Sequence, residues 1–324
     1  MTDQTRADKF NKKQFNEGGH AESNCPEELR ARINQENVQA TLDDIYKRLL
    51  PELGLTKDDV ESVGSTGKKL PGGSSGDIDL AMPQEKIMQA TDCQTPDEFL
   101  DFCQDLFQKL DVYDASAKGY GWKSVSCFWP IANVDGKQDG KYVQLDFVVT
   151  NNMKFVTWGM HGNQEVEVPD GTNPNDINPK GAVRMILLKA IAMGGHREIL
   201  RTDDIPGEGE NQPVEMVRYD FKFNEGLFKV HRTRKMKKSG GYAKGWDIDK
   251  EFITDDPDKI VRLVFNDDSM NADDVMDLRD MYDALIDSPM WEDEGVRHEI
   301  GRCFQNEMEQ HKGRYGAPTW LRFN

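Results

Sequence analysis

The spacing of apolar residues predicts two amphipathic helices in the first part of the chain. Apolar side chains recur with a helical period over residues 38–50 and stop at Pro51, which cannot continue a helix. A second helix is predicted over residues 95–110, because it opens with a threonine, a proline in the first turn and a glutamate three residues after the threonine. The apolar positions of each helix form one stripe, so both helices are expected to cover a core.

Strands are predicted where polar and apolar residues alternate, or where short apolar runs are bounded by turns. Residues 60–63 form one short strand, and residues 77–82 form another whose apolar positions share one face. The runs 124–131 and 142–149 flank a stretch rich in glycine and aspartate. They are therefore predicted to pair as an antiparallel hairpin.

The second half of the sequence predicts more helix than strand. Helices are predicted over residues 181–193, 257–265 and 273–286, and an acidic loop over 203–213. A second hairpin is predicted over 219–231, because two short strand-like runs flank an Asn-Glu-Gly turn.

Together these patterns predict an α/β protein with a mixed sheet flanked by helices and a mainly helical C-terminal region. We divide the sequence into a polar, flexible arm over residues 1–35, a core over 36–160, and a helical and hairpin region over 161–324. The 324 residues are 37% apolar and 31% charged, so the chain has enough apolar side chains to bury a substantial core.

The composition also bears on the compartment. No stretch approaches eighteen consecutive apolar residues, and the polar N-terminus lacks the apolar segment of a secretory signal. The five cysteines are odd in number, widely spaced and without a C-x-x-C pair, which is typical of buried thiols in a reducing compartment. We therefore expect no membrane partner and a cytoplasmic location.

The net charge of −17 argues against a protein that coats nucleic acid with its whole surface, because phosphate binding needs a positive field. However, residues 229–245 hold seven Lys and Arg residues and no acid, whereas residues 246–324 hold 20 acidic and 9 basic residues. This basic strip is either a contact for a polyanion or a solvated hairpin whose charges pair with the acidic segments. Its candidate nucleic-acid contacts are Arg232, Arg234, Lys235, Lys237 and Lys238.

Three aspartates lie at positions where the strand pattern makes a carboxylate costly. Asp146 lies inside the apolar run 143–149, where an ionised group must be paired or bound to a metal. Asp77 and Asp79 share one face of their predicted strand. Acids that cannot neutralise one another require a cation, and ligation by oxygen alone selects Mg²⁺ or Mn²⁺ over zinc.

The segment before these acids is suited to phosphate. Residues 64–76 are rich in glycine and serine, so they offer backbone N–H groups and hydroxyls to an anion. An acidic metal site beside a phosphate-binding loop is the arrangement of two-metal phosphoryl transfer, in which the ions stabilise the attacking and leaving oxygens.

These residues match a known signature. Gly64-Ser65, then Asp77-Ile78-Asp79-Leu80 and a later single acid, Asp146, resemble the DNA polymerase β-type nucleotidyltransferase superfamily. That superfamily includes template-independent poly(A) polymerases, tRNA CCA-adding enzymes and oligoadenylate synthases. The predicted element order is similar as well, over roughly residues 36–150. The resemblance implies a nucleotidyltransferase-fold catalytic core, although a long glycine-rich loop stands where many members place a short helix.

The resemblance also implies a reaction. A nucleoside monophosphate would pass from an NTP to an acceptor hydroxyl with release of pyrophosphate. Asp77 and Asp79 would ligate two Mg²⁺ or Mn²⁺ ions, and Asp146 would complete the metal site and help to deprotonate the attacking hydroxyl. The basic strip favours an RNA or tRNA 3′ end as the acceptor, whereas the overall acidity leaves a protein or a small molecule open.

Further residues are candidates for binding the nucleotide. By resemblance, Gly64 and Ser65 would hold the β- and γ-phosphates, with Lys68 or Lys69 adding positive charge. Arg184 and Lys189, on the helix predicted over 181–193, either contact the triphosphate or the base or are ordinary solvent-facing charges.

Two other functions stay open from the sequence. One is a catalytically idle nucleotidyltransferase fold that binds nucleotides or serves as an interaction module. The other is a nucleic-acid-binding protein without chemistry.

Overall fold

The computed structural model describes residues 23–64, 66, 70–116, 125–161, 171–173, 181–205, 207–223, 225–311 and 315–323. The described chain forms two compact units, with unit 1 running up to Met153 and unit 2 starting at Lys154. This division lies close to the core boundary predicted at residue 160.

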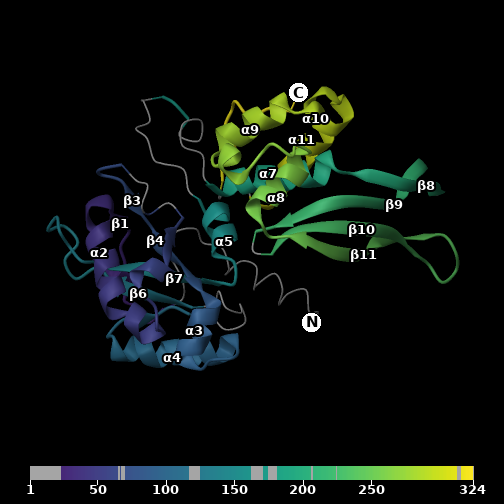
Figure 1. Ribbon diagram of the computed structural model, residues 1–324. Helices are drawn as coiled ribbons and strands as arrows, with labels where there is room; N and C mark the ends of the chain where they lie inside the picture. The colour runs from purple at the N-terminus through teal and green to yellow at the C-terminus, as the bar shows by residue number, and fades with distance from the viewer. Residues whose placement is uncertain are drawn as a thin grey trace. The chain divides into compact units, whose positions relative to one another are not determined.

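Unit 1 is built on a five-stranded sheet with strand order β2-β4-β7-β6-β5 (Figure 1). Its strands are β2 (Glu61–Val63), β4 (Asp77–Pro83), β5 (Tyr113–Asp114), β6 (Ser126–Pro130) and β7 (Tyr142–Thr150). A separate pair is formed by β1 (Ile33–Asn34) and β3 (Ser74–Ser75). The helices are α2 (Gln35–Arg48), α3 (Gln84–Thr91) and α4 (Pro96–Lys109), with short 3₁₀ turns at Glu27–Leu29, Leu50–Leu53 and Lys57–Asp59.

The pairing of the strands makes this sheet mixed. β4 and β7 are parallel, whereas the β2–β4, β6–β7 and β5–β6 pairs are antiparallel. The hairpin predicted from residues 124–131 and 142–149 is confirmed as β6 and β7. Its second strand also joins the strand of residues 77–82, and this parallel contact positions the candidate site.

The helices cover one face of this sheet. Ile78 and Leu80 of β4 are fully buried in the same core as the apolar side chains of α2 and α4. The start of α4 is as predicted, because Thr95 accepts a hydrogen bond from the N–H of Glu98 in a capping box. The α-helix predicted over residues 38–50 ends at Arg48, and the proline lies in the following 3₁₀ turn.

The described part of the predicted arm is folded onto unit 1. Cys25 is 2% exposed, and the guanidinium of Arg30 donates to the carbonyl oxygens of Cys25 and Ser23. Ile33 pairs with Ser75 and is fully buried. The prediction of a flexible arm is therefore wrong for residues 23–35. Most of these residues are polar, but Cys25 and Ile33 are buried and hold the segment in place. Residues 1–22 lie outside the described range.

Unit 2 combines helices with a four-stranded antiparallel sheet of order β11-β10-β9-β8. The strands are β8 (Glu198–Ile205), β9 (Gly209–Lys222), β10 (Gly226–Met236) and β11 (Tyr242–Thr254). The helices are α5 (Met153–Gly159), α7 (Gly181–Gly195), α8 (Pro257–Phe265), α9 (Leu278–Asp287), α10 (Pro289–Glu292) and α11 (Glu294–Gln310), with a 3₁₀ turn at Ala272–Val275.

The prediction of a mainly helical C-terminal region is therefore wrong for residues 198–254. The acidic loop predicted over 203–213 belongs largely to β8 and β9, and β11 was not predicted at all. Figure 1 shows the strands of this sheet extending beyond the helices of their own unit. β8 is exposed at every position but its last and lacks the apolar alternation that marks a half-buried strand. In β11 apolar and acidic residues do alternate over residues 246–249, a local pattern from which part of this strand could have been predicted.

Two composition-based predictions can be compared with the structure. All five cysteines are free and buried, as predicted. Within the described ranges, no helix is long and apolar enough to cross a membrane. The α/β class is confirmed by the mixed five-stranded sheet and its helices.

Candidate active site

The parallel register of β4 and β7 brings the three predicted aspartates to one place. Asp79 lies directly opposite Asp146, and Asp77 lies opposite Gln144. Directly paired residues project from the same face of a sheet, and alternate residues share a face. The three carboxylates therefore share one face, the one opposite to the buried Ile78.

Gly64, directly after β2, lies next to the carboxylate of Asp79. Gly64 has a φ of +70°, and a Cβ built there would lie 2.4 Å from Oδ2 of Asp79. A side chain is thus excluded both by the left-handed backbone and by the carboxylate. Thr66 is 1% exposed, and its hydroxyl donates to the carbonyl oxygen of Asp77 at 2.8 Å. These contacts hold the described part of the loop to the start of β4.

The carboxylates strongly influence one another. Burial raises the pKa of Asp79 well above its usual value, and the charges of Asp77 and Asp146 raise it further. Burial also raises the pKa of Asp146 to about 6, although hydrogen bonds from Ser126 and Gln144 oppose this shift. Neither Asp79 nor Asp146 forms an ion pair with another described residue. Such a group of acids favours the binding of a cation.

Sequence reasoning missed the side chains that hold the third acid. The amide nitrogen Nε2 of Gln144 donates to both oxygens of Asp146, at 2.8 and 3.0 Å. Ser126 lies opposite Asp146 on β6 and also hydrogen-bonds its carboxylate. The sequence could have indicated Gln144, because it precedes Asp146 by two residues and therefore shares its face of the strand. Ser126 could be found only from the strand register.

The donor set fits a hard divalent cation. Three carboxylates offer only oxygen ligands, and their mutual repulsion falls when positive charge is bound between them. As the side chains stand, no three or more His, Cys, Asp or Glu residues in the described ranges form a ready metal site.

Some predicted nucleotide contacts cannot be placed, and others are used elsewhere. Ser65, Lys68 and Lys69 lie outside the described residues. Arg184 is fully buried in unit 2 and is not a solvent-facing charge. Lys189 pairs with Glu307 at 2.8 Å.

The contacts of Arg184 are those of a structural residue. Its guanidinium donates to the carbonyl oxygens of Trp158 and Val275, and it lies 5.3 Å from the centre of the Trp158 ring. Burial lowers the pKa of Arg184 to about 10. Because these groups already use the guanidinium, we remove Arg184 and Lys189 from the nucleotide site.

The basic strip is divided by the fold. Arg232 and Arg234 lie on one face of β10, whereas Lys235 lies on the other, where it is 3.6 Å from Asp247. Lys237 and Lys238 are exposed in the turn after β10. The strip therefore does not form one continuous patch. Part of it pairs with acids, as the interpretation of a hairpin with paired charges predicted, and Arg234 forms an ion pair with Glu208.

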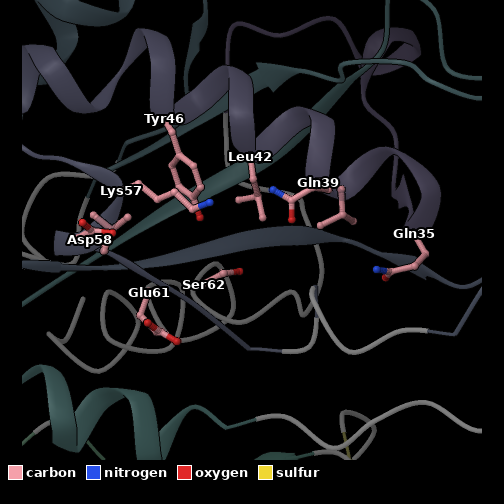
Figure 2. Close-up of a pocket in the computed structure, with 10 residues that line it drawn as sticks. Gln35, Gln39, Leu42, Tyr46, Lys57, Asp58, Glu61 and Ser62 are labelled. Atoms are coloured by element: carbon pink, nitrogen blue, oxygen red, sulfur yellow. The ribbon is translucent and has the colours of Figure 1, made fainter.

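A pocket of about 600 Å³ lies between α2 and the edge strand β2 (Figure 2). Figure 2 shows Leu42 and Tyr46 projecting from α2 toward the strand. Ser62 lines the pocket and pairs with Leu80, so it lies on the helix-covered face of the sheet. Asp79 projects from the opposite face. The pocket and the three aspartates therefore lie on opposite faces of the sheet.

The raised pKa of Asp146 predicts a pH-dependent stability. A group with a higher pKa in the folded state stabilises the fold below its unfolded pKa and loses this effect as the pH rises through the folded value. In EDTA, the free energy of unfolding of the wild-type protein should therefore fall by about 1 kcal/mol more between pH 5 and pH 7 than that of the Asp146→Asn variant. Adding Mg²⁺ at pH 7 should stabilise the wild type but have less effect on the variant. Urea unfolding curves test this, and parallel pH profiles would contradict it.

Comparison with known proteins does not supply a family. No family model matches the sequence, and no curated protein matches it. The function is therefore argued from the site.

Proposed function

We propose that the protein is a metal-dependent nucleotidyltransferase, which transfers a nucleoside monophosphate from an NTP to an acceptor hydroxyl and releases pyrophosphate. The observation that carries this proposal is the β4–β7 register, which sets Asp146 directly opposite Asp79 on the face that also bears Asp77. Three acids from two separate segments lie on one face of the sheet, beside a glycine whose lack of a side chain lets the Asp79 carboxylate lie against its backbone.

The residues of the site suit the steps of this reaction. Asp77, Asp79 and Asp146 would hold the divalent ions. When bound, Mg²⁺ supplies charge stabilisation for the attacking and leaving oxygens. Asp146 would help to deprotonate the attacking hydroxyl, since it lies directly opposite Asp79 on the face that bears the three acids. Gln144 and Ser126 hold its carboxylate in place.

The segment around Gly64 would receive the phosphates. Its backbone approaches β4 closely because residue 64 has no side chain, and Thr66 ties the segment to the strand. Ser65 and the basic pair Lys68 and Lys69 keep the roles that the resemblance gives them, as part of the proposal.

The test is an incorporation assay with the full chain. Each of the four α-labelled NTPs is incubated with single-stranded RNA, tRNA, single-stranded DNA, small nucleotides or the protein alone, and both label transfer and pyrophosphate are measured. We expect transfer that needs Mg²⁺ or Mn²⁺, stops in EDTA, and is lost in the Asp146→Asn variant. The Asp105→Asn variant is the matched control, because Asp105 is exposed on α4.

The outcomes separate the three functions. Absence of pyrophosphate release with every NTP and both metals would contradict the proposal. Nucleotide binding without turnover would instead indicate an idle module. Strong RNA binding that Asp77→Ala leaves unchanged, again without transfer, would indicate a nucleic-acid-binding protein without chemistry.

A further inference from the structure

The strand register of unit 2 places several arginines on one face of its sheet, together with one acid, Asp220, which lies opposite Phe228. Phe228, Val230, Arg232 and Arg234 of β10 lie opposite Phe252, Lys250, Ile248 and Trp246 of β11, and Arg218 of β9 lies opposite Val230. These residues share one face, which we call the arginine face. The other face of the same strands carries Asp247, Asp249 and Glu251 of β11 and Glu215 of β9.

Two arginines on this face have no ion-pair partner among the residues that the structure describes. Arg197 pairs with Glu299 of α11 at 3.1 Å, Lys250 is 3.7 Å from Asp220, and Arg234 pairs with Glu208. Arg218 and Arg232, in contrast, form no ion pair or hydrogen bond with any residue in the described ranges. Their Nε atoms, with that of Arg234, are buried without a hydrogen-bond partner.

The two unpaired guanidinium groups are close enough to repel each other. Burial lowers the pKa of Arg232, and the positive charge of Arg218 lowers it further. The negative charge of Asp220 opposes this shift, and the positive charge of Arg197 adds to it. Neighbouring, partly desolvated cations are stabilised when an anion binds between them. A guanidinium group offers its donors in a planar fork that matches a phosphate.

Aromatic and apolar side chains border this pair. The ring centre of Trp246 lies 5.3 Å from the guanidinium of Arg232 and 5.5 Å from that of Arg234. On the same strand, Ile248 is 51% exposed and Phe252 is 53% exposed. Alternating cations and exposed aromatic rings bind single strands, because phosphates contact the cations and unpaired bases stack on the rings. An acidic peptide would use the cations but not the stacking surface.

We propose that Arg218 and Arg232 bind a phosphate of a single-stranded nucleic acid, and that Trp246 and its apolar neighbours on the arginine face receive the adjoining bases. The inference rests on the proposed function only in that it names the class of acceptor. The binding chemistry is shared by RNA and DNA strands, so both are tested.

The experiment measures binding by the full-length protein. A fluorescein-labelled RNA 20-mer and a DNA 20-mer of mixed sequence are titrated by fluorescence anisotropy at several NaCl concentrations. The Arg218→Gln/Arg232→Gln variant should bind at least tenfold more weakly, and the slope of log K against log salt should become smaller by about 0.7, as expected for one lost phosphate contact to a single strand. Trp246→Ala should weaken binding fivefold or more through lost stacking.

A matched control removes two positive charges that lie outside the arginine face. Lys229 lies on β10 but on the opposite face, and Lys259 is exposed on α8, so Lys229→Gln/Lys259→Gln should bind within twofold of the wild type. An equal loss in this control would overturn the inference, because it would show general attraction rather than a built site. Circular dichroism checks that the arginine variant is folded, and Trp246→Ala on the edge strand provides a second test.

Competition and catalysis separate the remaining outcomes. Displacement of the strand by polyglutamate better than by unlabelled oligonucleotide would overturn the inference in favour of an acidic protein partner. Displacement by millimolar inorganic phosphate alone would reduce the site to a small-anion site and overturn it too. The Asp79→Asn variant should bind the strand normally. Binding without label transfer therefore contradicts only the proposed function, whereas transfer to strands without their binding to this face contradicts only the inference.

Discussion

The Asp79→Asn variant is expected to lose nucleotidyl transfer by about 10³-fold or more while remaining at least as stable as the wild type. When bound, a divalent ion would stabilise charge in the transition state by several kcal/mol, and about 4 kcal/mol corresponds to 10³-fold in rate, so removing Asp79 as one of its ligands would have a large effect. The free energy of unfolding, in contrast, should stay the same or rise. Asp79 is held next to Asp77 and Asp146, which with burial raise its pKa, so removing its charge relieves repulsion in the metal-free protein.

The opposite directions of these two effects make the prediction specific. The measurements are the rate of label transfer in Mg²⁺ and the urea midpoint in EDTA at pH 7, with Asp105→Asn as the control for the loss of one carboxylate from unit 1. A merely structural aspartate would give the reverse pattern, with lower stability and unchanged transfer. That result would remove Asp79 from the active site.

The Arg184→Ala variant is expected to lose about 3–5 kcal/mol of the free energy of unfolding of the unit that contains it. The substitution removes a fully buried side chain and leaves the carbonyl oxygens of Trp158 and Val275 without their donor. It also removes the guanidinium from the Trp158 ring.

Urea unfolding followed by tryptophan fluorescence measures this loss. Arg201→Ala is the matched control, since Arg201 is exposed and 3.7 Å from Glu215, and it should cost less than about 1 kcal/mol. A variant that unfolds normally but has a raised KM for NTP would contradict the structural role and restore Arg184 to the nucleotide site.

Local sequence patterns were sufficient for most of unit 1. The capping sequence at Thr95 and the alternation around Ile78 depend only on neighbouring residues, so helix α4 and strand β4 were predicted closely. The hairpin of β6 and β7 was also readable, because a turn-rich segment separates two apolar runs. The parallel pairing of β7 with β4 could not be predicted in this way, since it joins segments separated by α3, α4, β5 and β6.

Prediction failed where exposure or burial reversed the usual meaning of a residue type. β8 is exposed at every position but its last, so its polar residues resemble a loop although the backbone pairs as a sheet. Arg184 has the opposite problem. A charged residue on a helix is usually at the surface, but carbonyl groups of α5 and of the turn at Ala272–Val275 accept its donors and allow it to be buried.

The sequence by itself determined which chemical groups are present and, for most of unit 1, which local elements form. It placed Asp77 and Asp79 on one face of a strand and put Asp146 in an apolar run, because side-chain alternation is a local property. Tertiary structure decided that these acids meet, since only the strand register sets Asp79 opposite Asp146. It also decided that Arg218 joins Arg232 on one face of unit 2, because cross-strand pairing depends on contacts between distant segments that no local pattern specifies.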